Sequence, residues 1–412
     1  MLELNAPTTP TPSVGVRSAP APVAFLDARH ASWYGAQKSL ETLLDATRND
    51  LDIRFVTTAD GVLAEEMRGR GHHVDILPLG AHANVFGGQA IRGGPLRKLL
   101  VLRDVIRFWL RARRWLVQQE IEVAYANDIR ALLLLGPPAR TLGIPVVWYV
   151  RGDEALRLNA LGARIATRIV LIADAVKDRA FSASTRKAAG DRFRTVYTGF
   201  DCEAYRPQPG DRERVRKTWG LAPSDRVIGL VGSLTPRKGH DLIIKALPEV
   251  LERATDVHVV MVGDAPSNSQ SWVREQKRVA RELGVESHIH WVGYHEPIRE
   301  AYAGMDVLAL PSRSEGLPRV VIEALAAGVP AVATDTGGVR EILTHSDLGS
   351  VVPESDSSVL AAHLSGALDN QSLHGWEARE ERVRVAKARF TIPRYREDFL
   401  RVIRELDGRG LL

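Results

Sequence analysis

The stretch DVLALPSRSEGLPRVVIEALAAGVPAVAT, residues 306–334, combines two apolar runs with a polar loop and a short helical pattern. Its ends, Val307–Leu310 and Ala331–Thr334, have the length and apolar composition of buried strands. Pro318 suits the first position of a helix and Gly328 suits the left-handed residue after one, so we expect the helix between them. Strand, helix and strand in this order predict a βαβ unit with parallel strands.

Similar apolar runs alternate with helical patterns along the whole chain. Such runs, separated by helices, predict parallel sheets that are covered on both faces. Two series in tandem therefore predict an α/β protein with two Rossmann-like domains. The other strands that we expect are Val23–Leu26, Ile53–Thr57, Val74–Leu77, Val123–Ala126, Val146–Val150, Ile169–Ile172, Thr195–Thr198, Val227–Val231, Val257–Val262, Ile289–Val292 and Ser350–Val352.

Composition suggests the limits of the domains. Residues 1–20 are rich in Pro, Thr, Ser and Ala and lack the basic start and apolar block of a signal peptide, which predicts a disordered tail. The polar Pro/Gly segment around residues 207–210 marks a boundary between an N-terminal domain, 21–207, and a C-terminal domain, 208–391. We expect residues 392–412 to form a helix that packs back on the N-terminal domain.

The overall composition is that of a soluble globular protein, with 412 residues, 45% hydrophobic and 25% charged. No apolar run reaches the roughly 18 residues that span a bilayer. The single cysteine, Cys202, fits a reducing cytoplasm, where we expect the protein. A net charge of +5 favours anionic partners such as phosphates or anionic lipids. We do not expect nucleic acid, because the basic residues do not interleave with aromatics on a recognised module.

Polar residues and glycines gather in the loops that follow the expected strands. Ligands of open parallel sheets bind beyond the carboxyl ends of the strands, so two facing domains would form a cleft lined by these loops. The residues concerned are Gly35, His30, Asn127, Asp128, Arg151 and Asp153 in the N-terminal half, and Ser233, Arg237, Lys238, Gly293, Tyr294, Glu315, Gly316 and Leu317 in the C-terminal half.

Two glutamates flank the loop-to-helix junction of the opening stretch. Glu315 lies in the loop and Glu323 in the second turn of the expected helix. The N–H groups of Arg319 and Val320 would point out of the helix N-terminus, where unpaired donors and the helix dipole favour an anion. Spacing alone leaves a second interpretation open, in which Arg319 and Glu323 form a surface ion pair worth about 0.3 kcal/mol.

A basic turn follows the first strand of the C-terminal half. Lys238 and Arg237 are placed there to neutralise a diphosphate, although a solvated basic turn has the same pattern. The Gly-Lys-Ser/Thr order of a Walker loop is absent from the turn. The histidines are scattered along the sequence and form no metal-binding pattern, so we expect no metal site.

The segment 92–114 carries eight Arg or Lys residues and one Asp, with apolar residues at helical spacing. One interpretation is a helix that packs on the core with a solvated basic face, and this is the one we favour. The other is peripheral contact with the inner face of an anionic membrane.

These motifs, in this order, resemble the retaining glycosyltransferases of the GT-B fold in family 4. The resemblance is densest over 227–352 and extends over most of 23–406, and the run 302–343 is similar to the family's donor-binding core. The segment TVYTGFDCEAYRP, 195–207, resembles the family's link between domains. The resemblance implies transfer of a hexose-type sugar from a UDP- or GDP-sugar to a glycan, lipid-linked or small-molecule acceptor. It implies polysaccharide or glycoconjugate biosynthesis, and a reaction that requires no metal or other cofactor.

The resemblance also implies roles for single residues. Glu323 would accept hydrogen bonds from the donor ribose, Glu315 would contact the transferred sugar, and Lys238 would bind the pyrophosphate. The acceptor side would include His30, Asn127, Asp128 and Asp153. Backbone contacts to the donor would come from Gly316, Leu317, Arg319 and Val320 along the sugar and diphosphate, from Gly293 and Tyr294 at the base, and from Gly35 in the first domain.

Two departures from the family pattern concern charge. Ser233 stands where the family often has Arg, so one phosphate-neutralising charge is missing unless Arg237 supplies it. Arg151 stands where many members have a His near the reacting sugar, which points to a specialised acceptor or reduced activity. We assign Lys238, Arg237, Glu315 and Arg151 to the catalytic set.

The implied mechanism needs cations and N–H dipoles aimed at the leaving diphosphate. No protein nucleophile stands out, so our hypothesis is front-face transfer assisted by the donor phosphate. Two alternatives stay open at this point: a sugar-nucleotide epimerase of the same architecture, and a catalytically silent protein that binds nucleotide sugar or polysaccharide.

Overall fold

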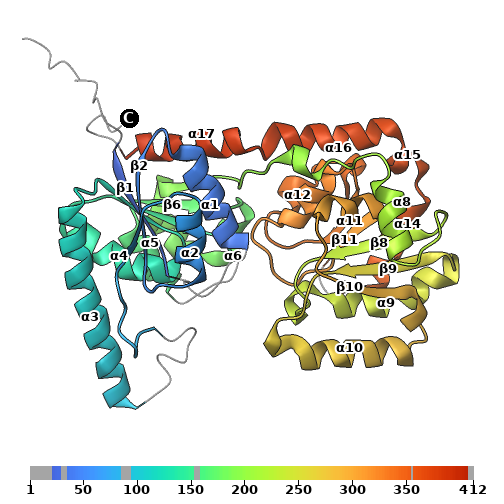
Figure 1. Ribbon diagram of the computed structural model, residues 1–412, viewed down its shortest axis with the longest axis horizontal. Coiled ribbons are helices and arrows are strands. Elements are labelled where there is room, and N and C mark those ends of the chain that lie inside the picture. Colours follow the sequence, from blue (N-terminus) through green and yellow to red (C-terminus); the bar gives the residue numbers. More distant parts are fainter. Residues whose placement is uncertain (1–20, 29–34, 85–93, 153–157, 354–355, 407–412) are drawn as a thin grey trace, which may run out of the picture.

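A computed structural model of the chain describes residues 21–28, 35–84, 94–152, 158–353 and 356–406. It contains two parallel sheets, each the centre of one lobe of the molecule (Figure 1). The first sheet has the strand order β3-β2-β1-β4-β5-β6-β7, and the second has the order β10-β9-β8-β11-β12-β13. In each sheet the chain first adds strands on one side of a central strand, β1 or β8, and then on the other side, as in doubly wound folds. The predicted α/β class with two Rossmann-like domains is therefore confirmed.

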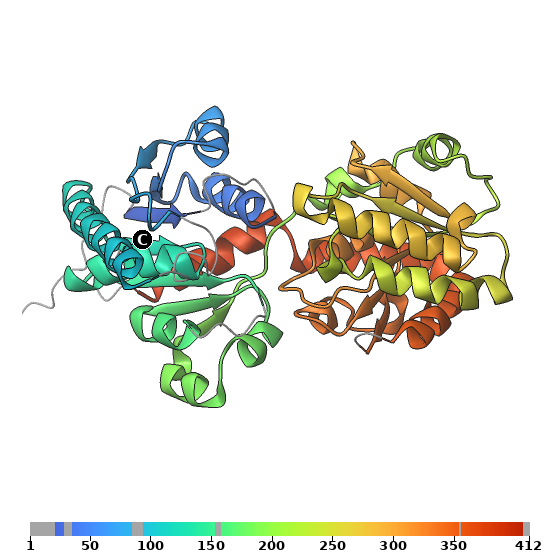
Figure 2. The same ribbon diagram turned by 90° about the horizontal axis from the view of Figure 1, so that it is seen from below.

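The first lobe holds seven strands with helices on both faces of the sheet (Figure 2). Its strands are β1 (Pro22–Asp27), β2 (Asp52–Thr57), β3 (Val74–Ile76), β4 (Val123–Ala126), β5 (Val146–Val150), β6 (Arg168–Leu171) and β7 (Phe193–Thr195). Its helices are α1 (Gly35–Thr47), α2 (Val62–Gly69), α3 (Pro95–Gln118), α4 (Ile129–Thr141), α5 (Asn159–Ile165), α6 (Ala175–Ala180) and α7 (Ala183–Ala189).

The second lobe is built in the same way. Its strands are β8 (Arg226–Val231), β9 (Val257–Val262), β10 (Ile289–Gly293), β11 (Val307–Leu310), β12 (Ala331–Thr334) and β13 (Gly349–Val352). Its helices are α8 (Asp211–Thr218), α9 (His240–Arg253), α10 (Gln270–Glu282), α11 (Ile298–Gly304), α12 (Arg319–Ala326), α13 (Val339–Ile342), α14 (Ser357–Asp369), α15 (Gln371–His374) and α16 (Trp376–Arg389), and α17 (Ile392–Arg404) follows them.

Each expected strand overlaps an observed one, and the largest difference is at β7. This edge strand covers Phe193–Thr195, whereas we expected Thr195–Thr198. The N–H of Val196 still donates to the carbonyl of Leu171 at 3.0 Å, and the chain then leaves the sheet. The hydroxyl of Tyr197 bonds Glu341 of the second lobe, so tertiary contact replaces strand pairing there.

The helix of the opening stretch is α12, which begins one residue later than expected. Pro318 is its N-cap, with φ −73° and ψ 101°, and not its first helical residue. Gly328 has φ +79°, the left-handed conformation that we expected after this helix. The helix is buried on nearly all sides, because it packs on the sheet and also on α16.

The chain crosses between the lobes twice, and the two crossings lie side by side. The N–H of Phe200 donates to the carbonyl of Phe390 at 2.7 Å, and Phe200 forms a bridge with Thr391. After this point α17 packs on α1 of the first lobe, where the Phe399 ring meets the Tyr125 ring edge-on at 5.7 Å (Figure 1). Both lobes are therefore tied together on the side of α17.

Candidate active site

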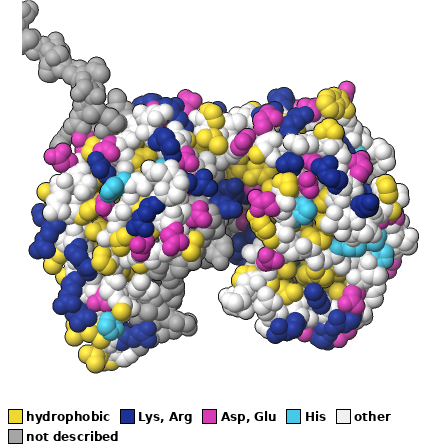
Figure 3. Space-filling model, in the orientation of Figure 1, with side chains coloured by type: hydrophobic (Ala, Val, Ile, Leu, Met, Phe, Trp, Pro, Cys, Tyr) yellow, Lys and Arg dark blue, Asp and Glu magenta, His cyan; other side chains and the backbone are white. Residues whose placement is uncertain are grey.

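The loops after β8, β9 and β11 come together at the carboxyl edge of the second sheet. Gly239, after β8, has φ +70°, and a Cβ added there would lie 1.8 Å from the carbonyl oxygen of Pro311, after β11. Only glycine permits this approach of two backbones. The edge faces the first lobe, and the surface is hollowed between the lobes on the side away from α17 (Figure 3).

Lys238 and Glu315 form an ion pair at this edge. Lys238 Nζ lies 2.7 Å from Glu315 Oε1, and Arg237 lies 3.5 Å from the same oxygen. Arg237 also donates to the carbonyl of Ser314 at 2.7 Å. Burial opposes ionisation of Glu315, but the charges of Lys238 and Arg237 outweigh it and hold the pKa of this carboxyl below its usual value. The site thus holds a nearly buried carboxylate between two cations.

Glu323 is also nearly buried, and two tyrosines that the sequence did not single out hold it. Tyr302 donates to its Oε2 at 2.8 Å and Tyr205 to its Oε1 at 3.2 Å, while Arg319 lies 3.5 Å from Oε1. Each carboxylate oxygen has a second lone pair, so capacity for a further donor remains. The Arg319–Glu323 pair of the alternative interpretation does form, but it is not an isolated surface pair.

The backbone before α12 touches the first lobe. A Cβ added at Gly316 would lie 2.0 Å from the carbonyl oxygen of Arg151, and the next residue, Leu317, is buried. One added at Gly35, the first residue of α1, would lie 3.5 Å from the Arg319 side chain. The first N–H groups of α12, those of Arg319 and Val320, point out of its N-terminus at this junction.

The residues expected to meet the base lie at the end of β10. Gly293 has φ +71° and its carbonyl accepts the N–H of Gly263 at 2.7 Å, which joins the loops after β9 and β10. Tyr294 is 67% exposed, and its hydroxyl donates to Glu296. Ser233 is exposed in the loop after β8. These side chains are accessible, and their expected roles stay predictions.

Arg151 turns its side chain into the first lobe. Its guanidinium donates to Asn127 Oδ1 at 2.8 Å and to Ser39 Oγ at 2.9 Å, and lies 4.0 Å from the centre of the Tyr149 ring. The Asn127 amide donates in turn to the buried carboxylate of Asp27 at 2.6 Å. A cation and an anion are therefore linked through one amide, and a direct catalytic role for Arg151 stays a prediction.

The other residues expected on the acceptor side divide into two groups. Asp128 caps α4, because its carboxylate accepts the N–H of Ala131 at 2.7 Å. This contact gives Asp128 a structural role that helix-capping preferences explain. His30 and Asp153 lie outside the described residues.

Glu341 links the lobes and was missed as a contact residue. Its carboxylate accepts the N–H groups of Asp174 and Ala175 at 2.9 and 2.8 Å, at the start of α6, and the hydroxyl of Tyr197. Near it, Arg179 donates to the carbonyl of Asp335. Nothing in the local sequence pattern marks a carboxylate that caps a helix of another domain.

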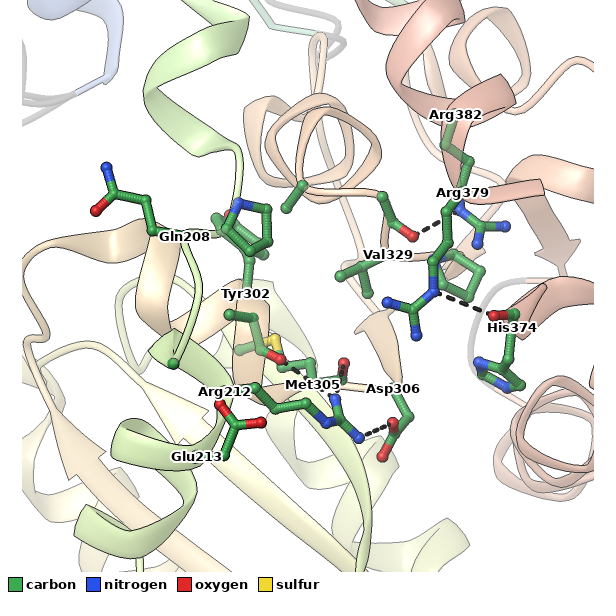
Figure 4. Close-up of a pocket in the computed structure, with 16 residues that line it drawn as sticks. Gln208, Arg212, Glu213, Tyr302, Met305, Asp306, Val329, His374, Arg379 and Arg382 are labelled. Carbon is green, nitrogen blue, oxygen red and sulfur yellow. Dashed lines mark hydrogen bonds and ion pairs between the residues drawn. The ribbon is translucent and has the colours of Figure 1, made fainter. Parts of the chain in front are cut away.

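A separate cavity of about 210 Å³ lies at the opposite, amino edge of the second sheet (Figure 4). It is lined by residues of α8, α11 and α16 and by the residues just before β11 and β12. The guanidinium of Arg382 donates hydrogen bonds there to the carbonyls of Gly328, Asp347 and Leu373. Tyr302 lines this cavity and also holds Glu323, but the cavity itself is not at the loop edge. Among the described residues, no group of three or more His, Cys, Asp or Glu side chains could hold a metal ion.

Two protein-family models, several known proteins and several solved structures are similar to the chain. Residues 211–389 match a family model described as Glycosyl transferases group 1, and residues 61–204 match one described as Glycosyltransferase Family 4. A GDP-mannose-dependent alpha-(1-6)-phosphatidylinositol monomannoside mannosyltransferase of Mycolicibacterium smegmatis is 30% identical over 308 residues, 67% of this chain and 78% of that protein. A D-inositol 3-phosphate glycosyltransferase of Mycobacterium marinum is 29% identical over 328 residues, 77% and 61% of the two chains. The structure of Anabaena Alr3699/HepE in complex with UDP is similar in fold, with a TM-score of 0.75 at 22% identity, covering 93% of this chain and 99% of that one.

Proposed function

The chain belongs to the group 1 glycosyltransferases, and from this premise we propose that it moves a hexose-type sugar from a UDP- or GDP-sugar to a glycan, lipid-linked or small-molecule acceptor with retention of configuration. The observation that carries the proposal is the pair of Lys238 and Glu315 beside the N-terminus of α12, at the edge that faces the first lobe. A mannosyltransferase relative that depends on GDP-mannose supports a nucleotide-sugar donor, and a fold neighbour that holds UDP is consistent with one.

Lys238 supplies the charge that the reaction needs. When the bond between the sugar and the phosphate breaks, its electron pair leaves with the diphosphate, and positive charge nearby stabilises this product. In the free protein Glu315 neutralises Lys238 at 2.7 Å. A bound diphosphate would share the lysine, and Glu315 would then accept hydrogen bonds from sugar hydroxyls.

The rest of the reaction needs few protein groups. The acceptor hydroxyl forms the new bond on the face that the diphosphate leaves, and its proton passes to a phosphate oxygen. Arg237 and the α12 N-terminus add positive charge, so we propose that transfer requires no metal. Glu323 would orient the donor through its ribose, held in place by Tyr302 and Tyr205.

The proposal is tested by titrating the protein with UDP-, GDP- and ADP-sugars and following transfer to a panel of acceptors. We expect one donor class to bind, and Lys238→Ala to weaken binding by roughly 10- to 100-fold, because it removes a charge-assisted bond worth about 1.5–3 kcal/mol. Transfer should persist in EDTA.

Lys245→Ala is the matched control, because Lys245 is an exposed lysine on α9, which follows the same loop. It should bind the donor as the natural chain does. The absence of binding by any sugar nucleotide to the folded protein would refute the proposal.

A further inference from the structure

One face of α3 exposes an unusual amount of apolar surface. Among the described residues, twelve large hydrophobic side chains are exposed, and six of them belong to this helix. They are Leu96, Leu99, Leu102, Ile106, Leu110 and Val117, each between 44% and 69% exposed. Leu99, Leu102, Ile106 and Leu110 follow one another at three- and four-residue steps, so they form one continuous ridge.

The same helix is strongly basic around this ridge. Residues 94–118 contain seven Arg or Lys side chains and a single acidic one, Asp104. Asp104 is buried, where it accepts the N–H of His82 and a bond from Arg103. Since Arg103, Arg107, Arg113 and Arg114 are exposed beside the ridge, their long side chains can extend from an apolar surface toward charged groups.

The opposite face of α3 holds the helix firmly on its lobe. Phe108, Ala112 and Trp115 are buried against the domain, and the Trp115 indole donates to Asp75 at 2.9 Å. Trp109 donates to the carbonyl of Leu133 in α4 at 3.0 Å. The sequence interpretation of a core-packed helix is therefore correct for this face, but it leaves the exposed ridge without an explanation.

We propose that the exposed face of α3 docks on a membrane surface of anionic phospholipid. Apolar side chains enter the headgroup boundary while arginines pair with lipid phosphates, the composition that interfacial helices share. A second copy of the chain fits less well, because two strongly basic helices would repel each other. Basic side chains gather along this outer edge of the first lobe (Figure 3).

The position of α3 suits such docking for a transferase. The N-terminal end of the helix projects toward the side of the molecule on which the groove between the lobes opens (Figures 1 and 3). The helix also lies on the outer edge of the first lobe, away from the second lobe, so a lipid surface docked on its exposed face would leave the groove uncovered. The inference does not depend on which sugar is transferred, so its failure would leave the proposed function standing.

The test is co-sedimentation of the full chain with phosphatidylcholine vesicles, with and without phosphatidylglycerol. We expect binding only to the anionic vesicles, and loss of it as salt rises from about 0.1 M to about 1 M, where the Debye length falls from about 10 Å to 3 Å. Lys98→Glu, Arg107→Glu and Arg113→Glu together should weaken binding by roughly 100-fold or more, because each basic residue contributes about 1 kcal/mol.

Two further variants separate the contribution of the apolar ridge to vesicle binding from that of the net charge of the protein. Replacing Leu102, Ile106 and Leu110 with alanine keeps the helix and the charge, and should also abolish binding. The control changes Lys217, Lys245 and Arg274 of the second lobe to Glu, an equal change of net charge, and should bind like the natural chain.

Three results would overturn the proposal. They are no binding at low salt, equal binding to vesicles without phosphatidylglycerol, and a dimer in sedimentation velocity that the alanine variant dissociates. The last result would assign the ridge to a second copy of the chain.

Discussion

The surroundings of Arg151 explain how a guanidinium is accommodated where many family members have histidine. Tyr125, Asn127 and Ser39 accept its N–H groups. The Asn127 amide also donates to the buried carboxylate of Asp27. Gln37 donates to the same Asp27 oxygen at 3.1 Å. The guanidinium is thus held by three acceptors that belong to one hydrogen-bond network with Asp27.

Arg151→Ala should lower the free energy of unfolding by about 3 kcal/mol, because it removes three hydrogen bonds donated by a cation and leaves their acceptors on Asn127, Ser39 and Tyr125 without this donor. Arg151→Lys should recover part of this loss. Chemical denaturation measures both, with the exposed Arg140→Ala as the control that should change little. If Arg151→Ala folded with natural stability but lost transfer, the residue would act on the substrate and not on the fold.

Sequence reasoning found the charged residues of the site but not their partners. Lys238, Arg237 and Glu315 follow strands, so the rule for parallel sheets places them at one edge. Tyr302 and Tyr205 contact Glu323 from other elements, and no local pattern encodes such a contact. Asp27 was likewise only the end of a strand until the fold placed Asn127 beside it.

Strands were the elements that the sequence predicted best, because each buried strand needs an apolar run whatever its neighbours are. β7 departs from its expected limits since an edge strand has one partner, and contacts of Tyr197 with Glu341 compete with pairing.

The first turn of α9 contains a buried histidine. His240 is buried there against Trp272, and burial lowers the pKa of its imidazole to about 4, although a bond to Thr235 opposes the shift.

This element should make the protein sensitive to acid. As pH falls below about 6.5 the unfolded chain protonates His240, whereas the folded chain keeps it neutral until pH 4 is approached. Above pH 6.5 both states hold His240 neutral and the group has no effect on the free energy of unfolding. At pH 5 it lowers the free energy of unfolding by about 2 kcal/mol.

The measurement is the difference in unfolding free energy between pH 7 and pH 5. His240→Gln should reduce that difference by about 2 kcal/mol, while His363→Gln, an exposed histidine on α14, should leave it unchanged. Equal differences for both variants would show that His240 is not the group responsible.

At the scale of the whole molecule, the two lobes meet through backbone as well as side chains. Glu341 caps α6 of the first lobe, and the loop before α12 lies against the carbonyl of Arg151. The Glu341 contact lies close to the crossings, because Tyr197, which donates to Glu341, packs its ring on that of Phe390 at 5.5 Å. The sequence could predict two domains and a cleft, but not which residues hold the domains together, because such contacts depend on both surfaces at once.

Gly316→Ala tests this arrangement. The added Cβ would lie 2.0 Å from the carbonyl oxygen of Arg151, so the observed contact between the lobes could not form without movement of the backbone. Because misplacement of reacting groups by about 1 Å costs roughly 10²-fold in rate, we expect transfer to fall by about that factor, with a larger radius of gyration in X-ray scattering. Gly366→Ala on α14 is the control, since nothing lies within 4 Å of the added atom, and it should gain roughly 0.5–1 kcal/mol of stability. Natural transfer and an unchanged radius in Gly316→Ala would mean that this contact is not used in the reaction.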